Sequence, residues 1–169
     1  MEWPIVVCVP RKKVKKARRL LGKNKNVTVK GFNFVGLEGF AWFEKMVFNK
    51  NFGMPRPRNV LIPALMTAIE AGYKNIYVAG ADHSWLETIR VTDDNHIVSV
   101  QPHFYKDSSR ELKRSEVEYR GYRLHDILLS FYVAFRSYHR LERYAGKMGI
   151  NIYNSTPGSY IDAFRRRQL

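Results

Sequence analysis

Short apolar runs alternate with helical patterns along most of the chain. Compact runs rich in β-branched and aromatic residues predict strands at residues 3–9, 26–34, 75–79 and 150–153. Apolar residues spaced three and four apart predict helices at residues 11–21, 36–48, 60–71 and 124–145. Because strands that alternate with helices form mainly parallel sheets covered by helices, the pattern predicts an α/β protein with a Rossmann-like three-layer fold.

Three segments depart from this alternation. Residues 87–91 and 96–100 flank Asp93-Asp94-Asn95, which is typical of a β-hairpin with turn-forming residues at its centre. Residues 106–120 mix both charges without periodicity, and we expect them to form a mobile excursion from the fold. The turn at residues 154–159 is expected to lead into a short C-terminal helix.

The length of 169 residues is enough for one domain, and no linker is visible, so residues 1–169 are predicted to form a single domain. Cys8 is the only cysteine, which excludes an internal disulfide and fits a reducing compartment. The apolar run at residues 5–9 is short and precedes its positive charges, unlike a signal peptide. We therefore expect a cytoplasmic protein.

The formal net charge of +14 is concentrated in one segment. Residues 11–19 carry seven cations, and Val14 and Ala17 lie at helical spacing among them. Such a helix could bind an anionic membrane surface, a phosphorylated glycan or nucleic acid, or it could be a solvated helix face. Nucleic acid is the less favoured partner, because no helix-turn-helix, zinc-finger or RNA-recognition signature accompanies the charge. The membrane alternative places the protein at the inner membrane face.

Two loops are the candidate site, because ligands of open parallel sheets bind beyond the carboxyl ends of the strands. After the strand at 75–79, Gly80 permits a sharp turn, and Asp82 and His83 supply a carboxylate and an imidazole. We expect the second loop to cradle an anion or a nucleotide with its hydroxyl and amide groups, which come from Asn154, Ser155, Thr156 and Ser159. Either loop could also be purely structural, with Asp82 capping a turn and Ser155 or Thr156 acting as an N-cap.

Two of the remaining histidines, His103 and His125, are candidates for a general base, which must titrate near neutrality and lie within reach of a hydroxyl. His103 starts the predicted excursion, and His125 opens the long helix beside Asp126. A mobile segment that closes over substrate could supply either of them, although each could equally be a solvated surface residue. No G-x-G-x-x-G, Walker, H-E-x-x-H or G-x-S-x-G motif is present, which disfavours a conventional dinucleotide enzyme, a P-loop ATPase and a serine hydrolase.

Residues 68–82, AIEAGYKNIYVAGAD, resemble the helix, Gly-Tyr-Lys, strand and Gly-x-Asp signature of bacterial lipooligosaccharide sialyltransferases. They also resemble the related MptE-like family, named for 6-hydroxymethylpterin diphosphokinases. Residues 150–159, INIYNSTPGS, are similar to the last strand of those families and its Pro- and Ser-containing loop. The resemblance covers roughly residues 59–162.

The sialyltransferase resemblance implies a Rossmann-like fold, a cytidine-monophosphate sugar as donor and no metal or other cofactor. It implies donor contacts near Gly80, Asp82 and the loop at 155–159, and a lid at residues 103–125. In that family a lid histidine is the base, which points to His103 or His125, and tyrosines steady the leaving phosphate. The tyrosines available for this role are Tyr105, Tyr119 and Tyr122.

One feature of both families is missing from residues 1–58. Their first strand leads into a Gly-Asn-Gly-Pro-Ser type loop that holds the nucleotide, so we expect a truncated or minimal version that lacks part of the donor site. Three functions stay open: a sialyltransferase-like glycosyltransferase acting on a glycan, an MptE-like Mg²⁺-dependent diphosphokinase that uses Asp82, and a non-catalytic basic module that binds nucleic acid or membrane.

Overall fold

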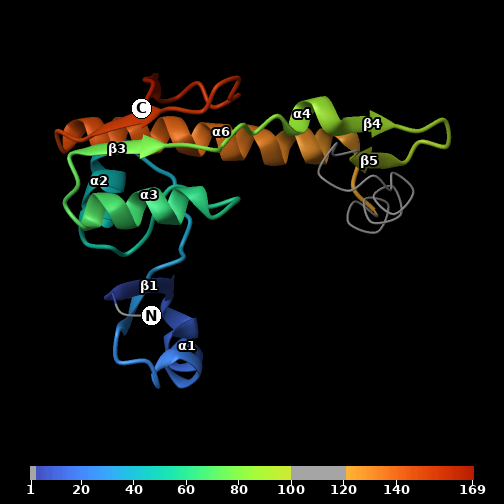
Figure 1. Ribbon diagram of the computed structural model, residues 1–169. Helices are drawn as coiled ribbons and strands as arrows, with labels where there is room; N and C mark the ends of the chain where they lie inside the picture. Colours follow the sequence, from blue (N-terminus) through green and yellow to red (C-terminus); the bar gives the residue numbers. More distant parts are fainter. Residues whose placement is uncertain (1–2, 100–120) are drawn as a thin grey trace.

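The computed structural model describes residues 3–99 and 121–169 and combines short strands and helices (Figure 1). The helices are α1 (Val14–Leu21), α2 (Ala41–Asn49), α3 (Leu61–Glu70), α4 (Trp85–Thr88) and α6 (Leu124–Lys147). The strands are β1 (Ile5–Pro10), β2 (Val27–Phe32), β3 (Asn75–Val78), β4 (Ile89–Val91), β5 (Ile97–Ser99), β6 (Asn151–Asn154) and β7 (Arg165–Arg166). They form a parallel pair β1–β2, a parallel sheet ordered β3–β6–β7 and an antiparallel pair β4–β5. The predicted α/β class with mainly parallel sheets is therefore confirmed.

The N-terminal unit is a βαβ arrangement of β1, α1 and β2, drawn in blue at the bottom of Figure 1. A Cβ atom at Gly31 would lie 2.8 Å from Cγ2 of Val14, so glycine is what allows α1 to lie this close to β2. Val14 and Ala17 are half-buried, and all seven cations of residues 11–19 are exposed. The predicted basic helix is present, and Val14 and Ala17 pack inside the unit, whereas Leu20 and Leu21 at the end of the helix are exposed.

The central body surrounds the β3–β6–β7 sheet. Helices α3 and α6 pack against each other, and α6 packs against β6. Pro63 lies in the first turn of α3, where its missing N–H costs no helical hydrogen bond, and Gly72 follows that helix with φ +88°. The largest fully buried side chains of this core are Tyr138, Phe48, Ile62, Leu141 and Ile161.

The predicted hairpin is also present, and Figure 1 shows it beyond the N-terminal end of α6. Asn95 takes a left-handed φ of +62° in its turn, a conformation that asparagine tolerates well. The hydroxyls of Thr88 and Ser99 lie 2.9 Å apart and join the one-turn helix α4 to β5.

The prediction of a short C-terminal helix is wrong. After the turn, the Ser159 hydroxyl accepts the Ile161 N–H at 3.2 Å, and the Asn154 amide donates to the Ile161 carbonyl at 3.1 Å. These backbone groups are therefore hydrogen-bonded to side chains and not to the backbone partners that a helix would provide. The chain then continues as β7, in parallel register with Tyr153 and Asn154. The expected start of the second helix at residue 36 is also wrong, because the backbone of Val35 and Leu37 bonds to Met54 and α2 begins only at Ala41.

Across the described residues, no helix combines the length and apolar character needed to cross a bilayer.

Candidate functional site

The two loops singled out in the sequence lie together at one edge of the central sheet. Strands β3 and β6 are parallel neighbours, with Val78 opposite Asn154, so the segments that follow them leave the sheet side by side. The Ala81 N–H donates to the Thr156 hydroxyl at 3.1 Å, and the Ser159 hydroxyl donates to the Ala81 carbonyl at 2.6 Å. These hydrogen bonds join the two loops into one surface.

The polar side chains of the second loop are engaged in shaping it. Asn154 is 1% exposed, donates to the Ser159 hydroxyl at 2.9 Å and accepts the Thr156 N–H at 3.0 Å. The Ser155 hydroxyl donates to the Arg167 carbonyl at 2.5 Å. Because no helix follows this loop, it also lacks the helix N-terminus expected of an anion cradle. The donor contacts of these four residues stay a prediction, and the hydrogen-bond partners observed for them lie within the protein.

Asp82 is the exposed carboxylate of the first loop. The Ser84 hydroxyl donates to its Oδ2 at 2.6 Å, and this hydrogen bond, outweighing the effect of burial, holds the pKa of Asp82 below its ordinary value. The Asp82 carbonyl accepts the Tyr160 N–H at 2.7 Å, which ties the loop to the segment after Ser159. Asp82 is therefore a fixed negative charge at the edge of the site.

His83 forms a hydrogen-bonded cluster with two residues that the sequence patterns did not single out. Its Nε2 lies 2.6 Å from the Tyr138 hydroxyl, to which the Asn59 amide donates at 2.7 Å. Since Asn59 supplies a proton to the phenol oxygen, the phenol O–H is available to donate to Nε2. This pattern assigns His83 the neutral tautomer with its proton on Nδ1.

The electrostatics of the cluster agree with that assignment. Burial lowers the pKa of His83 below its ordinary 6.5, partly opposed by the negative charge of Asp82. Burial also raises the pKa of the fully buried Tyr138 to about 12, so its hydroxyl stays protonated. A neutral imidazole and a protonated phenol are therefore the stable pair near neutral pH.

Aromatic rings enclose the His83 imidazole. The Trp85 ring lies 4.2 Å from it, centroid to centroid, and Phe135 packs edge-on at 6.4 Å. Phe131 extends this wall, 5.7 Å from Trp85. His83 also adopts φ +57°, an uncommon conformation for a residue with a side chain. The packing and the two hydrogen-bond partners hold it there.

The other histidines of the described residues do not join this cluster. His125 is exposed and lies 3.4 Å from Asp126, and thirteen residues of helix place it about 20 Å along α6 from Tyr138. His139 pairs with Asp162 at 3.0 Å on an exposed surface. The proposed base His103 and the predicted phosphate contacts Tyr105 and Tyr119 lie outside the described residues, as does most of the predicted lid.

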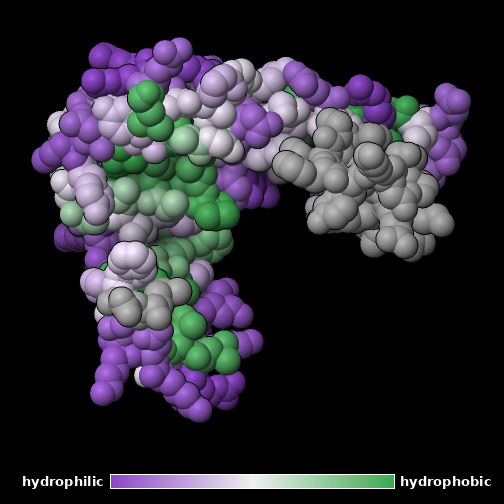
Figure 2. Space-filling model, in the orientation of Figure 1, coloured by the Kyte–Doolittle hydropathy of each residue, from purple (hydrophilic) through white to green (hydrophobic). Residues whose placement is uncertain are grey.

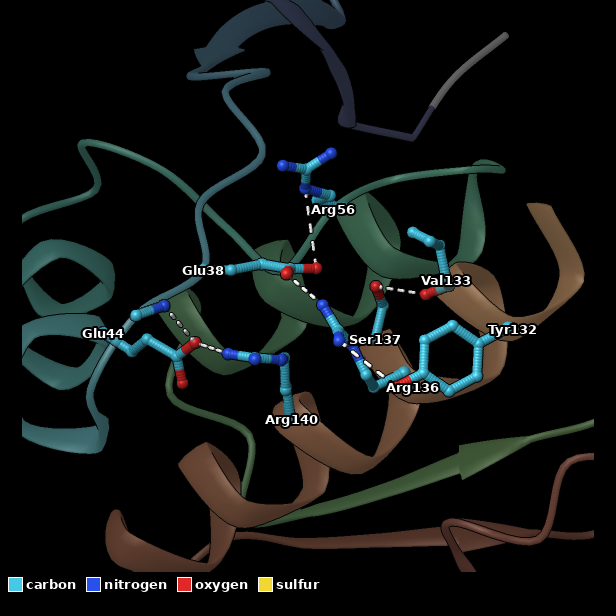
Figure 3. A network of polar contacts seen from close by, with 9 residues as sticks. Glu38, Glu44, Arg56, Tyr132, Val133, Arg136, Ser137 and Arg140 are labelled. Atoms are coloured by element: carbon cyan, nitrogen blue, oxygen red, sulfur yellow. Dashed lines mark hydrogen bonds and ion pairs between the residues drawn. The ribbon is translucent and has the colours of Figure 1, made fainter. Parts of the chain in front are cut away.

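A second polar network anchors α6 on a different side of the helix (Figure 3). Arg136 binds Glu38, and Arg140 binds the buried carboxylate of Glu44. Burial opposes ionisation of Glu38, but the hydrogen bond and charge of Arg136 outweigh it and lower the pKa of Glu38. Residues two apart on a helix face different directions, so Arg136 and Tyr138 serve different surfaces. This network fixes α6 against the segment that contains α2.

The described residues offer no metal site, and comparison with known proteins adds no further residues to the site. Within residues 3–99 and 121–169, no group of three or more His, Cys, Asp or Glu side chains is placed to hold a metal ion. The chain matches no protein-family model, no curated protein and no solved structure.

Proposed function

We propose that the chain is a sialyltransferase-like glycosyltransferase that transfers a sugar from a nucleotide-activated donor, a cytidine-monophosphate sugar, to a glycan hydroxyl. The observation that carries the proposal is the position of the His83–Tyr138 pair, beside two hydrogen-bonded loops at the carboxyl ends of adjacent parallel strands. The proposal includes a Rossmann-like three-layer fold, to which the parallel β1–β2 and β3–β6–β7 sheets would both contribute.

The reaction exchanges one bond at the anomeric carbon of the sugar. The acceptor oxygen forms a bond to this carbon, the bond to the phosphate oxygen breaks, and cytidine monophosphate leaves with the electron pair. In the assigned tautomer the Nδ1–H of His83 is a hydrogen-bond donor, and we assign it to the leaving phosphate. The proton of the acceptor hydroxyl passes to a base, for which His103 remains the proposed candidate, because His125 lies about 20 Å along α6 from Tyr138.

Tyr138 and Asn59 are positioning residues in this scheme. By donating to Nε2, the Tyr138 hydroxyl keeps the mobile proton of His83 on Nδ1, and Asn59 orients the Tyr138 hydroxyl in turn. The arrangement resembles a catalytic triad, in which a third group fixes the tautomer and orientation of the catalytic imidazole.

The test is metal-free release of cytidine monophosphate from cytidine-monophosphate N-acetylneuraminic acid in the presence of a glycan acceptor. We expect His83→Asn, which tolerates a positive φ, to lower kcat by about a hundredfold or more. His139→Asn is the matched control and should leave kcat within about twofold. A wild-type protein that releases no nucleotide from any cytidine-monophosphate sugar, or an unaffected His83→Asn variant, would refute the proposal.

We also propose that residues 11–19 dock the protein to an anionic membrane surface at the cytoplasmic face. The support is the set of seven exposed cations on one short segment. Val14 and Ala17 pack inside the N-terminal unit, so the attraction would be mainly electrostatic, with the exposed Leu20 and Leu21 beside the cations as the apolar side chains that could contact the membrane.

A further inference from the structure

A cavity of about 620 Å³ lies between the N-terminal unit and the start of α3. Figure 2 shows hydrophobic surface where Figure 1 places α3, next to the N-terminal unit. The volume is within the range of small-molecule sites in proteins, about 300–1,000 Å³. Its walls come from the ends of β1 and β2, the loop before α3 and the first turns of α3.

The cavity lies where a parallel sheet binds ligands. Pro10 is the last residue of β1 and Phe32 is the last residue of β2, and both line it. These strands are parallel, so the cavity lies beyond their carboxyl ends. Asn59 lines the same cavity and donates to the Tyr138 hydroxyl at 2.7 Å. One side chain therefore borders both the cavity and the His83 cluster.

The residues that line the cavity favour a ligand that has both a flat ring and a negatively charged group. Phe32 and Phe34 are tilted against each other at 6.3 Å, and the ring of Pro57 adds a further flat apolar face. Phe34 is 47% exposed, so its ring is accessible for stacking. Arg58 is exposed at the cavity, and no carboxylate among the described residues lies within ion-pair distance of it, whereas its neighbour Arg56 pairs with Glu38.

We propose that this cavity binds the nucleotide portion of the donor, with the base against Phe32 and Phe34 and the phosphate at Arg58. This inference rests on the proposed glycosyltransferase function and names the part of the protein that would select a nucleotide. The base would occupy the carboxyl ends of β1 and β2, and the phosphate, bound by Arg58 on one side, would extend past Asn59 toward His83.

Cys8 provides a direct probe, because it lines the cavity and is the only cysteine in the chain. The rate of alkylation of the intact protein by iodoacetamide reports access to this thiol alone. We expect cytidine monophosphate to slow alkylation in proportion to the fraction of sites filled. Ribose 5-phosphate, which lacks the base, should protect much less at the same concentration.

Two substitutions test the base and the phosphate of the ligand separately. Phe34→Ala should weaken cytidine and cytidine monophosphate by about tenfold each in isothermal titration calorimetry, because it removes one stacking face. Arg58→Gln should weaken cytidine monophosphate and leave cytidine unchanged, since only the phosphate meets the guanidinium. Phe52→Ala is the matched control, an exposed phenylalanine that does not line the cavity, and it should have no effect.

The outcomes separate this inference from the function on which it rests. Binding of cytidine monophosphate with no change in Cys8 alkylation, or with full affinity in Phe34→Ala, would overturn the cavity assignment and leave the glycosyltransferase proposal standing. Protection of Cys8 without any transfer or donor cleavage would overturn the proposed reaction and support the cavity as a nucleotide site. No nucleotide binding of any kind would overturn both.

Discussion

The hydroxyl of Tyr138 lies 2.6 Å from Nε2 of His83 and joins the middle of the long helix α6 to the loop after β3. The two residues are 55 positions apart in the sequence, and Asn59, 79 positions before Tyr138, completes the cluster. A fully buried hydroxyl with two defined partners is costly to remove, so the pair affects stability as well as the proposed chemistry.

Tyr138→Phe should destabilise the fold by about 1–3 kcal/mol, because it leaves the Asn59 amide and His83 Nε2 without their shared partner. The free energy of unfolding from urea denaturation measures this effect. Tyr73→Phe is the control, since that ring is 63% exposed, and it should change the value by less than about 0.5 kcal/mol. Equal stabilities of the two variants would contradict the cluster as described.

The stability of the protein should fall as the pH is lowered through 6.5. The pKa of His83 is lowered in the folded state, so between that lowered pKa and 6.5 the unfolded chain binds more protons than the folded one. Stability increases with pH wherever the unfolded state binds more protons, so this contribution is present above 6.5 and is lost toward acid. Thermal unfolding from about pH 7.5 to about pH 5.5 measures it.

His83→Asn should flatten that pH dependence, because it removes the titrating group and keeps a residue that tolerates a positive φ. His125→Asn, at an exposed position, should retain the wild-type slope. A His83→Asn variant with the full wild-type slope would assign the effect to another group.

The Glu44–Arg140 pair should contribute far more to stability than a surface pair. Glu44 is 6% exposed, and Arg140→Met would leave its carboxylate without its cation, at a cost of about 3 kcal/mol. Lys30→Met removes one member of the exposed pair with Glu70 and should cost less than about 1 kcal/mol. Urea denaturation of both variants gives the comparison.

A double-mutant cycle separates pairing from side-chain packing at this site. Glu44→Met combined with Arg140→Met should cost less than the sum of the two single changes, because no buried charge is left unpaired. Strict additivity would mean that the two side chains do not stabilise each other.

Membrane docking through residues 11–19 should depend on the positions of the charges and not on net charge alone. Replacing Lys12, Lys13, Lys15 and Lys16 with Gln should reduce the free energy of binding to phosphatidylglycerol vesicles by up to about 4 kcal/mol. Co-sedimentation with the vesicles measures this loss. The control replaces the same number of exposed lysines elsewhere, at Lys45, Lys50, Lys74 and Lys147. Equal losses in both variants, or equal binding to phosphatidylcholine, would contradict specific docking by this segment.

Periodicity predicted the elements whose stability depends on local pattern and burial. The stripe that ends at Leu141 and Ala145 predicted α6, and the apolar run before Gly80 predicted β3. Because neighbouring parallel strands end at one edge, the meeting of the two loops could also be anticipated. The C-terminal helix could not be excluded this way, because its competitors are hydrogen bonds from Ser159 and Asn154.

The His83 cluster could not be predicted from spacing, because its partners look ordinary in the sequence. Tyr138 falls in the apolar stripe of α6 and reads as a core residue, while Asn59 falls in a Pro- and Arg-rich loop. Their roles depend on how α6, β3 and the loop before α3 pack together. The only local signal was His83 itself, directly after a strand and the Gly80-Ala81-Asp82 turn.

The central claim, that a nucleotide donor binds at the loops after β3 and β6, is tested most directly by titrating ¹⁵N-labelled protein with cytidine monophosphate. The largest amide shifts are expected around the cavity, in residues 32–34 and 58–60, and in the two loops, in residues 80–84 and 155–160. The Asn59 side-chain amide should shift with them, and the shifts in the loops should be lost in Asp82→Ala. Shifts confined to residues 11–19, or no saturable shifts at all, would contradict the claim.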